Sequence, residues 1–122
     1  VGLARDAAFS FTYEANLTAL RRMGAELATF SPLADAALPD GLDALYLPGG
    51  LPEVFEAELT ANVAMAASVR AAVEGGLRVY AECGGMLYLS MIDITAKWTG
   101  RRQDWARIHA QLAIFYEDRL RD

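Results

Sequence analysis

Short apolar runs alternate with amphipathic stretches along most of the chain, and this alternation restricts its fold more than any other feature. Apolar runs short enough for buried strands fall at residues 1–4, 26–30, 43–47 and 77–81. Patterns with a helical period fall at residues 13–23, 53–59 and 61–73, and a further helix starts near Met86. Strands that alternate with helices are typical of a parallel sheet covered by helices. We therefore predict an α/β fold with a doubly wound parallel sheet, whose functional loops lie at the carboxyl ends of the strands.

Two of the expected helices carry apolar residues at a spacing that predicts a buried face. In the first helix, Leu17, Leu20 and Met23 recur three residues apart, and Gly24 follows as a helix-ending residue. The longer helix places five apolar residues roughly on one face: Val63, Met65, Ala66, Val69 and Val73. We expect both faces to be buried.

The composition of the chain excludes several classes of protein. Hydrophobic residues make up 54% of its 122 residues and charged residues 22%, which excludes intrinsic disorder. The net charge of −5 argues against nucleic-acid binding through clustered cations, and no apolar run approaches the roughly 20 residues of a membrane span. No signal-peptide pattern is present, so we expect a cytoplasmic protein without nucleic-acid or membrane partners. The single cysteine, Cys83, excludes an internal disulfide, and no Cys/His cluster indicates a metal site.

The strongest local signal surrounds Cys83, where an expected strand leads into a tight turn and then a helix. Ala81 and Gly85 are small residues two positions before and after the cysteine, which is the spacing of a nucleophile elbow. Larger side chains there would collide where the strand and the helix cross. The start of the helix would stabilise a thiolate, and the Gly84 N–H would face a developing oxyanion. The alternative is a buried cysteine that packs as a small hydrophobic residue, and the short pattern leaves both interpretations open.

The second signal is a Gly-Gly pair in the segment LPGGLPE at residues 47–53. Glycines let the backbone present its N–H groups to a ligand, so this loop would supply a second oxyanion donor if it lay beside the cysteine. The alternative is an ordinary turn between a strand and a helix.

Together the two loops resemble the glutamine amidotransferase domain of the cobyrinic acid a,c-diamide synthase family. The resemblance rests on the motifs PGGLPE at residues 48–53 and AECGGMLYL at residues 81–89. The stretch ARDAAFSF at residues 4–11, followed by Tyr13 and Asn16-Leu17, resembles the opening motif of that family. Further matches occur in family order: FSPL at residues 30–33, Leu38-Pro39, Leu59 and Asn62. The resemblance covers residues 1 to about 90 and is specific, because several motifs agree in order and spacing.

The resemblance implies a flavodoxin-like fold of the class I glutamine amidotransferase type and a ligase of cobalamin biosynthesis. In that family an ATP- and Mg²⁺-dependent P-loop domain activates the a and c carboxylates of cobyrinic or hydrogenobyrinic acid. A triad-type glutaminase domain releases ammonia from glutamine. By position, Cys83 would be the catalytic thiolate that forms a γ-glutamyl thioester. Gly50 and Gly84 would supply the N–H groups of the oxyanion hole, while Gly49 and Glu53 would help to bind glutamine.

The chain departs from the family in two respects. It has no Walker-type G-x-x-x-x-G-K-[ST] motif, so we expect no cofactor on this chain and place ATP and Mg²⁺ on a missing synthetase domain. The family's catalytic histidine lies on a later strand in an aromatic motif, whereas the one histidine here, His109, lies in a stretch expected to be helical. Because a cysteine nucleophile needs a base, His109 is a candidate for that role. The default interpretation is that His109 is a surface or half-buried helix residue without a catalytic role.

The sequence therefore divides into an incomplete amidotransferase-like α/β domain at residues 1–90 and a divergent, mainly helical tail at residues 91–122. An incomplete sheet exposes apolar surface, so we predict a homo-oligomer in which the tail helix near Trp105 and Phe115 covers the sheet edge. Arg5 and Asp6 follow a strand end, where a role at a substrate or domain interface competes with a surface ion pair.

Three functional hypotheses follow. The elbow and the Gly-Gly loop favour a glutaminase that supplies ammonia to a synthetase. The missing histidine motif and the divergent tail favour a non-catalytic remnant that binds glutamine or a partner chain. A weaker alternative is a cysteine hydrolase or redox-sensing domain similar to the DJ-1-like proteins.

Overall fold

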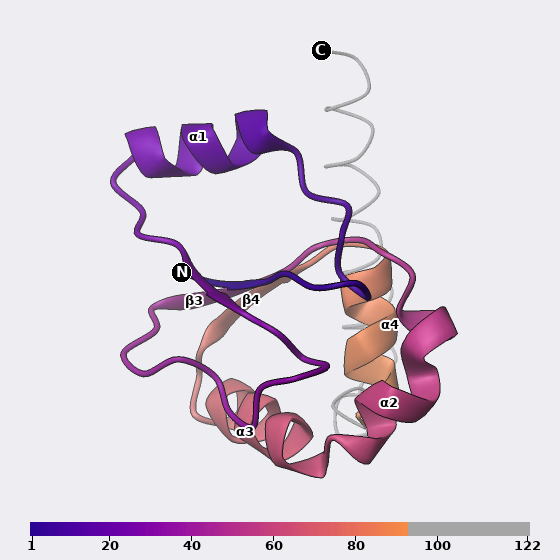
Figure 1. Cartoon of the computed structure of the whole chain (residues 1–122). Coiled ribbons are helices and arrows are strands. Elements are labelled where there is room, and N and C mark those ends of the chain that lie inside the picture. The colour runs from indigo at the N-terminus through magenta and orange to yellow at the C-terminus, as the bar shows by residue number, and fades with distance from the viewer. Residues whose placement is uncertain (93–122) are drawn as a thin grey trace, which may run out of the picture.

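The computed structural model describes residues 1–92, which form a four-stranded sheet with helices on both faces (Figure 1). The elements follow in the order β1 (Gly2–Ala4), α1 (Glu14–Arg22), β2 (Ala28–Phe30), β3 (Ala44–Leu47), the 3₁₀ turn η1 (Pro52–Phe55), α2 (Glu56–Ala61), α3 (Val63–Glu74), β4 (Arg78–Ala81) and α4 (Gly84–Met91). The strand order is β2-β1-β3-β4, and each neighbouring pair is parallel. The predicted α/β fold with a parallel, flavodoxin-like sheet is confirmed. The predicted tail helix, with Trp105, His109 and Phe115, lies outside the described residues.

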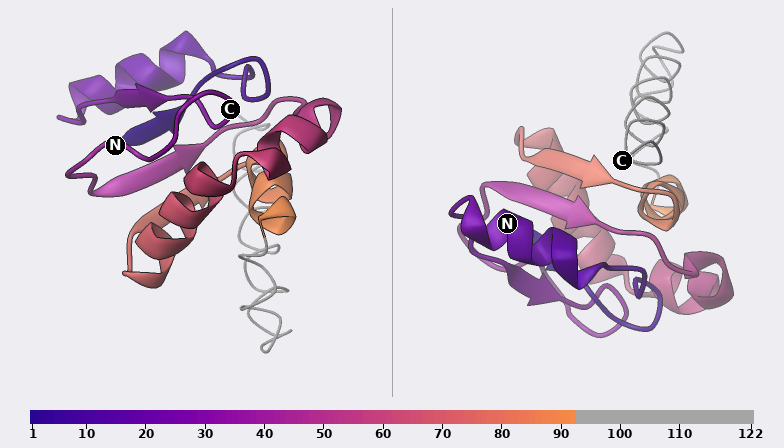
Figure 2. Two further views of the ribbon diagram at one scale, coloured as in Figure 1. Left: turned by 60° about the horizontal axis from the view of Figure 1, so that its bottom comes forward. Right: turned by 90° about the horizontal axis from the view of Figure 1, so that it is seen from above.

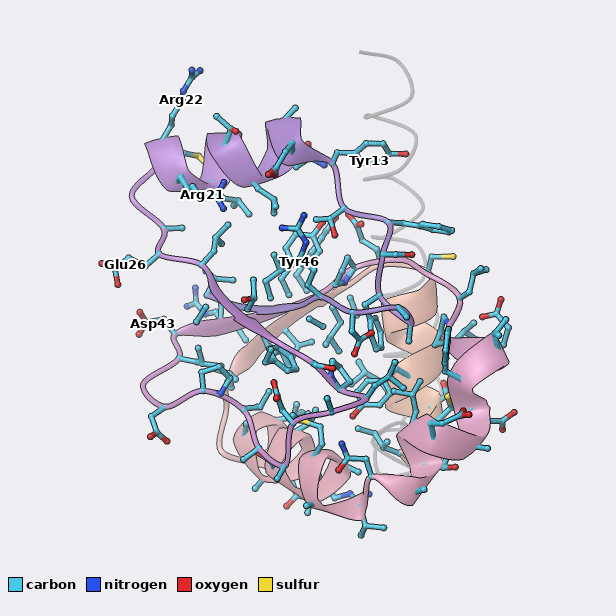
Figure 3. The ribbon with its side chains drawn as sticks, viewed as in Figure 1. Tyr13, Arg21, Arg22, Glu26, Asp43 and Tyr46 are labelled. Carbon is cyan, nitrogen blue, oxygen red and sulfur yellow. The ribbon has the colours of Figure 1, made fainter. Side chains whose placement is uncertain are left out.

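Two groups of buried side chains lie on opposite faces of the sheet. Leu3 and Tyr46 pack with Leu17 of α1, and Tyr46 lies on the side of the sheet that faces this helix (Figure 3). Leu45 and Leu47 belong instead to the larger core, whose buried helical residues come from α2, α3 and α4. Because successive residues of a strand point to opposite faces, the three consecutive residues of β3 serve both layers. Figure 1 shows the result, with α1 on one side of the sheet and α3 on the other.

Two apolar residues that the sequence assigned to buried helix faces are exposed, and those predictions are wrong. Met23 is 78% exposed and Val63 is 68% exposed. Met23 is the residue that follows the last turn of α1, and Val63 is the first residue of α3. At a helix end the neighbouring turn that would help to cover a side chain is absent, so the helical period no longer predicts burial. The predicted helix at residues 53–59 is also divided, into η1 and α2.

Asn62 fastens the loop after β2 to the start of α3. Its Oδ1 accepts a hydrogen bond from the Met65 N–H at 3.3 Å, which caps the helix. Its Nδ2 donates to the carbonyl oxygens of Pro32 and Asp35 at 2.8 and 2.9 Å. The loop that follows β2 is therefore held against the helix that covers the larger core. Within the described residues, no helix is both long and apolar enough to cross a membrane.

Tyr88 of α4 is fully buried in the larger core, yet its hydroxyl has no hydrogen-bond partner among residues 1–92. Its ring meets the ring of Phe9 edge to face, with 5.4 Å between the centroids. Burial, assisted by the negative charge of Asp6, raises the pKa of Tyr88 to about 12 from its ordinary value of 10.0. The ring contributes packing, whereas the hydroxyl has been removed from water without compensation.

Replacing Tyr88 by phenylalanine is therefore expected to leave the free energy of unfolding unchanged or to raise it by about 1 kcal/mol. The wild-type chain should also lose stability as the pH rises from 10 to 12, because the unfolded tyrosine ionises there while the buried one keeps its proton. The variant should lack that part of the pH dependence. Urea unfolding of both proteins at neutral pH and at several alkaline values tests this, and a clear loss of stability in Tyr88→Phe at neutral pH would contradict it.

Candidate active site

Cys83 stands exposed in the turn between β4 and α4, and its backbone adopts φ 43° and ψ −104°. It is the only non-glycine residue with a positive φ in the part of the chain that the structure describes. The Gly85 N–H donates to the Glu82 carbonyl at 2.7 Å and the Met86 N–H to the Cys83 carbonyl at 3.0 Å, which closes the turn. The geometry is that of a strained elbow with its thiol directed outward. The alternative of a buried cysteine is therefore wrong.

The two glycines after Cys83 lie where any side chain would collide. A Cβ on Gly85 would meet the Leu47 carbonyl oxygen and would lie 2.8 Å from the Leu47 Cβ, because α4 starts directly against β3. A Cβ on Gly84 would lie 2.9 Å from the Pro52 Cδ and 3.0 Å from the Gly50 nitrogen. The requirement for a small residue at position 85, which the sequence pattern predicted, thus has a direct steric cause.

The Gly-Gly loop and the cysteine turn are neighbours. The loop follows β3 and the turn follows β4, and these two strands pair in parallel. In the right-hand view of Figure 2 the arrows of β3 and β4 point the same way, and α2 and α4 lie beyond their tips. A Cβ built on Gly49 would lie 3.9 Å from the Cys83 Cβ, and the Gly50 nitrogen lies next to Gly84. Among the turn, loop and cap hydrogen bonds of residues 1–92, none is donated by the N–H groups of Gly50 or Gly84, and both residues are buried.

Glu53 is less closely tied to this group than the glycines are. It is an exposed residue of η1, the turn that follows the Gly-Gly loop, and no hydrogen bond joins it to the cysteine turn within the described residues. The structure therefore brings Gly49, Gly50, Cys83 and Gly84 together, whereas Glu53 is exposed and not bonded to this group. The described part of the chain also contains no group of three or more His, Cys, Asp or Glu side chains that could hold a metal ion.

The residue before the cysteine is held by two tyrosines. Tyr80 donates its hydroxyl to Glu82 Oε1 at 2.7 Å, and Tyr46 donates to Oε2 at 3.3 Å. The two rings stand edge to face with 5.2 Å between their centroids. No local sequence pattern predicts this cluster, because the pairing of β3 with β4 creates it.

The loop after β1 also belongs to the site, because it is hydrogen-bonded to the Gly-Gly loop. Sequence reasoning missed this contact. The Phe11 N–H donates to the Gly49 carbonyl at 3.1 Å, and the Leu51 N–H donates to the Ala8 carbonyl at 3.0 Å. Among residues 1–92 the Asp6 carboxylate has no ion-pair partner; it accepts hydrogen bonds from within this loop. An aspartate whose side chain accepts a hydrogen bond from the backbone N–H two residues later is typical of an Asx turn. This turn is the signal that could have pointed to the loop after β1.

Comparison with known proteins agrees with the motifs. Residues 1–105 match the family model of the CobB/CobQ-like glutamine amidotransferase domain. The chain is 58% identical over 89 residues to the hydrogenobyrinate a,c-diamide synthase of Pseudomonas aeruginosa and 51% identical over 90 residues to the cobyrinate a,c-diamide synthase of Dehalococcoides mccartyi. These alignments include 73% and 74% of this chain but 20% and 19% of the relatives, so the chain spans about a fifth of their length.

No solved structure matches the chain. The resemblance that the PGGLPE and AECGGMLYL motifs indicated is nevertheless confirmed by the family model and by the relatives. The chain belongs to the family of CobB/CobQ-like glutamine amidotransferase domains.

Proposed function

We propose that this chain is the glutaminase part of a glutamine-hydrolysing cobyrinic or hydrogenobyrinic acid a,c-diamide synthase, an ATP-dependent ligase of cobalamin biosynthesis. The family match and the names of the relatives support the substrate class. The observation that carries the proposal is the exposed Cys83 in its strained turn, with the backbone of Gly50 next to Gly84, the residue that follows the cysteine.

In the proposed reaction the Cys83 thiolate attacks the carboxamide carbon of glutamine. A carbon–sulfur bond forms, and the carbonyl oxygen takes up negative charge that the Gly50 and Gly84 N–H groups stabilise. The carbon–nitrogen bond then breaks, and ammonia leaves once its nitrogen has gained a proton. Water hydrolyses the remaining γ-glutamyl thioester to glutamate and the free thiol.

The proton transfers require a general acid and base. Residues 1–92 contain no histidine, and His109, the one histidine of the chain, is the candidate that His109→Ala tests. Gly49 and Glu53 are proposed to help bind glutamine, with the exposed Glu53 carboxylate suited to the ammonium group of the substrate. ATP and Mg²⁺ belong to the synthetase domain in this proposal, and no step assigned to the present chain uses them. A cytoplasmic location and a homo-oligomeric state remain predictions.

Labelling with a glutamine-like diazoketone tests the proposal, with intact-mass spectrometry as the readout. The wild-type chain is expected to gain one adduct, and Cys83→Ser none, because the reagent uses the glutamine site to reach the thiol. Iodoacetamide serves as the control, since it needs only an accessible thiol. A chain that reacts with iodoacetamide but not with the diazoketone would be a non-catalytic remnant of the domain.

A further inference from the structure

We infer that Asp6 is a positioning residue whose carboxylate holds the turn at residues 6–9 and, through that turn, the backbone of Gly49 and Gly50 opposite Cys83. The inference deepens the proposed function and rests on it for its catalytic meaning. The structural part, that Asp6 determines the position of the Gly-Gly loop, stands on the hydrogen bonds alone.

Both oxygens of the Asp6 carboxylate are fully used. Oδ1 accepts from the N–H groups of Ala8 and Phe9 at 2.8 and 3.2 Å, which closes the turn. Oδ2 accepts from the Ser31 hydroxyl at 2.8 Å and from the Leu33 N–H at 3.0 Å, which ties the turn to the loop after β2. All four partners are donors, so the site requires an acceptor at both oxygens. An asparagine amide has one acceptor and would place N–H groups against donors on one side.

The turn that Asp6 holds makes a hydrogen bond to the Gly-Gly loop and packs against it. The Ala8 carbonyl oxygen accepts from the Leu51 N–H at 3.0 Å and lies where a Cβ of Gly50 would be. The Phe11 N–H donates to the Gly49 carbonyl at 3.1 Å. Hydrogen bonds therefore flank Gly50 on both sides, one with Ala8 inside the turn that Asp6 holds and one with Phe11, two residues after it.

The same segment is also fixed to α4, which carries the other proposed oxyanion donor. The buried ring of Phe9 meets the buried ring of Tyr88 at 5.4 Å between centroids. Gly84 is the first residue of that helix. The loop after β1 thus relates Gly50 to Gly84, and hydrogen-bond donors of an oxyanion hole need to be placed to within a fraction of an ångström.

Asp6→Asn tests the inference in the full 122-residue chain, with Asp43→Asn as the control. Asp43 is exposed, and its side chain makes no hydrogen bond within the described residues. The first readout is hydrogen exchange of the Leu51 and Phe11 amides, measured by NMR. Asp6→Asn is expected to speed their exchange about tenfold or more, and Asp43→Asn is expected to leave it unchanged.

The second readout separates positioning from general damage. Diazoketone labelling of Cys83 should slow about tenfold in Asp6→Asn, while iodoacetamide labelling stays at the wild-type rate. If Asp6→Asn does not fold, Ser31→Ala removes one donor to the carboxylate and should change the same amides in the same direction by a smaller factor. Unchanged exchange at Leu51 and Phe11 in a folded variant would overturn the inference. A wild-type chain that takes no diazoketone refutes the proposed glutaminase, whereas the exchange result still decides the role of Asp6.

Discussion

Gly85→Ala is expected to lower the free energy of unfolding by about 3 kcal/mol or more, which is the largest stability effect we expect from a single methyl group. The new Cβ would overlap the Leu47 carbonyl oxygen and come within 2.8 Å of the Leu47 carbonyl carbon and Cβ. Leu47 lies in β3, which is paired on both sides, so this backbone cannot move away without breaking the sheet. Urea unfolding followed by circular dichroism measures the loss.

Gly49→Ala is the matched control, because it adds the same methyl group to the neighbouring loop. Its Cβ would find only ordinary contacts, at 3.6 Å from the Phe11 Cβ and 3.9 Å from the Cys83 Cβ. The two variants differ in the space around the methyl group rather than in its chemistry. Equal stability of Gly85→Ala and Gly49→Ala would contradict the packing of α4 against β3 described above.

The second large effect is expected at Cys83, where glycine should be more stable than alanine by about 1 to 2 kcal/mol. The backbone there has φ 43° and ψ −104°, which side-chain-bearing residues rarely adopt and glycine adopts without strain. Both Cys83→Gly and Cys83→Ala should lose all reaction with the diazoketone and with iodoacetamide, since each lacks the thiol. Urea unfolding of the two variants gives the difference in stability, and mass spectrometry confirms the loss of labelling.

A control at an ordinary position shows the opposite order. Ala67 is an exposed residue inside α3, where Ala67→Gly is expected to reduce stability by about 1 kcal/mol. If glycine is more stable than alanine at position 83 but less stable at position 67, the backbone at Cys83 is strained. A less stable glycine variant at both positions would mean that the turn is unstrained.

The parts of the fold that could be predicted from sequence are those that depend on neighbouring residues. The alternation of apolar runs and helical patterns predicted the four strands found in residues 1–92 and the positions of α1, α3 and α4. The spacing around Cys83 predicted the turn, because the small residue at position 85 is required locally by the crossing of strand and helix. The same local reasoning failed at Met23 and Val63, where the helix ends and the periodic pattern does not.

The sequence by itself thus determined the type of fold, the family motifs and the residue that carries the exposed thiol, since each of these follows from short-range patterns. Only the tertiary structure decided which loops meet. Gly50 lies beside Gly84 because β3 pairs with β4, and the Asp6 carboxylate reaches Ser31, 25 residues away, because β1 pairs with β2. Contacts of this kind depend on the order of strands in the sheet, and no pattern within a single segment of the chain specifies that order.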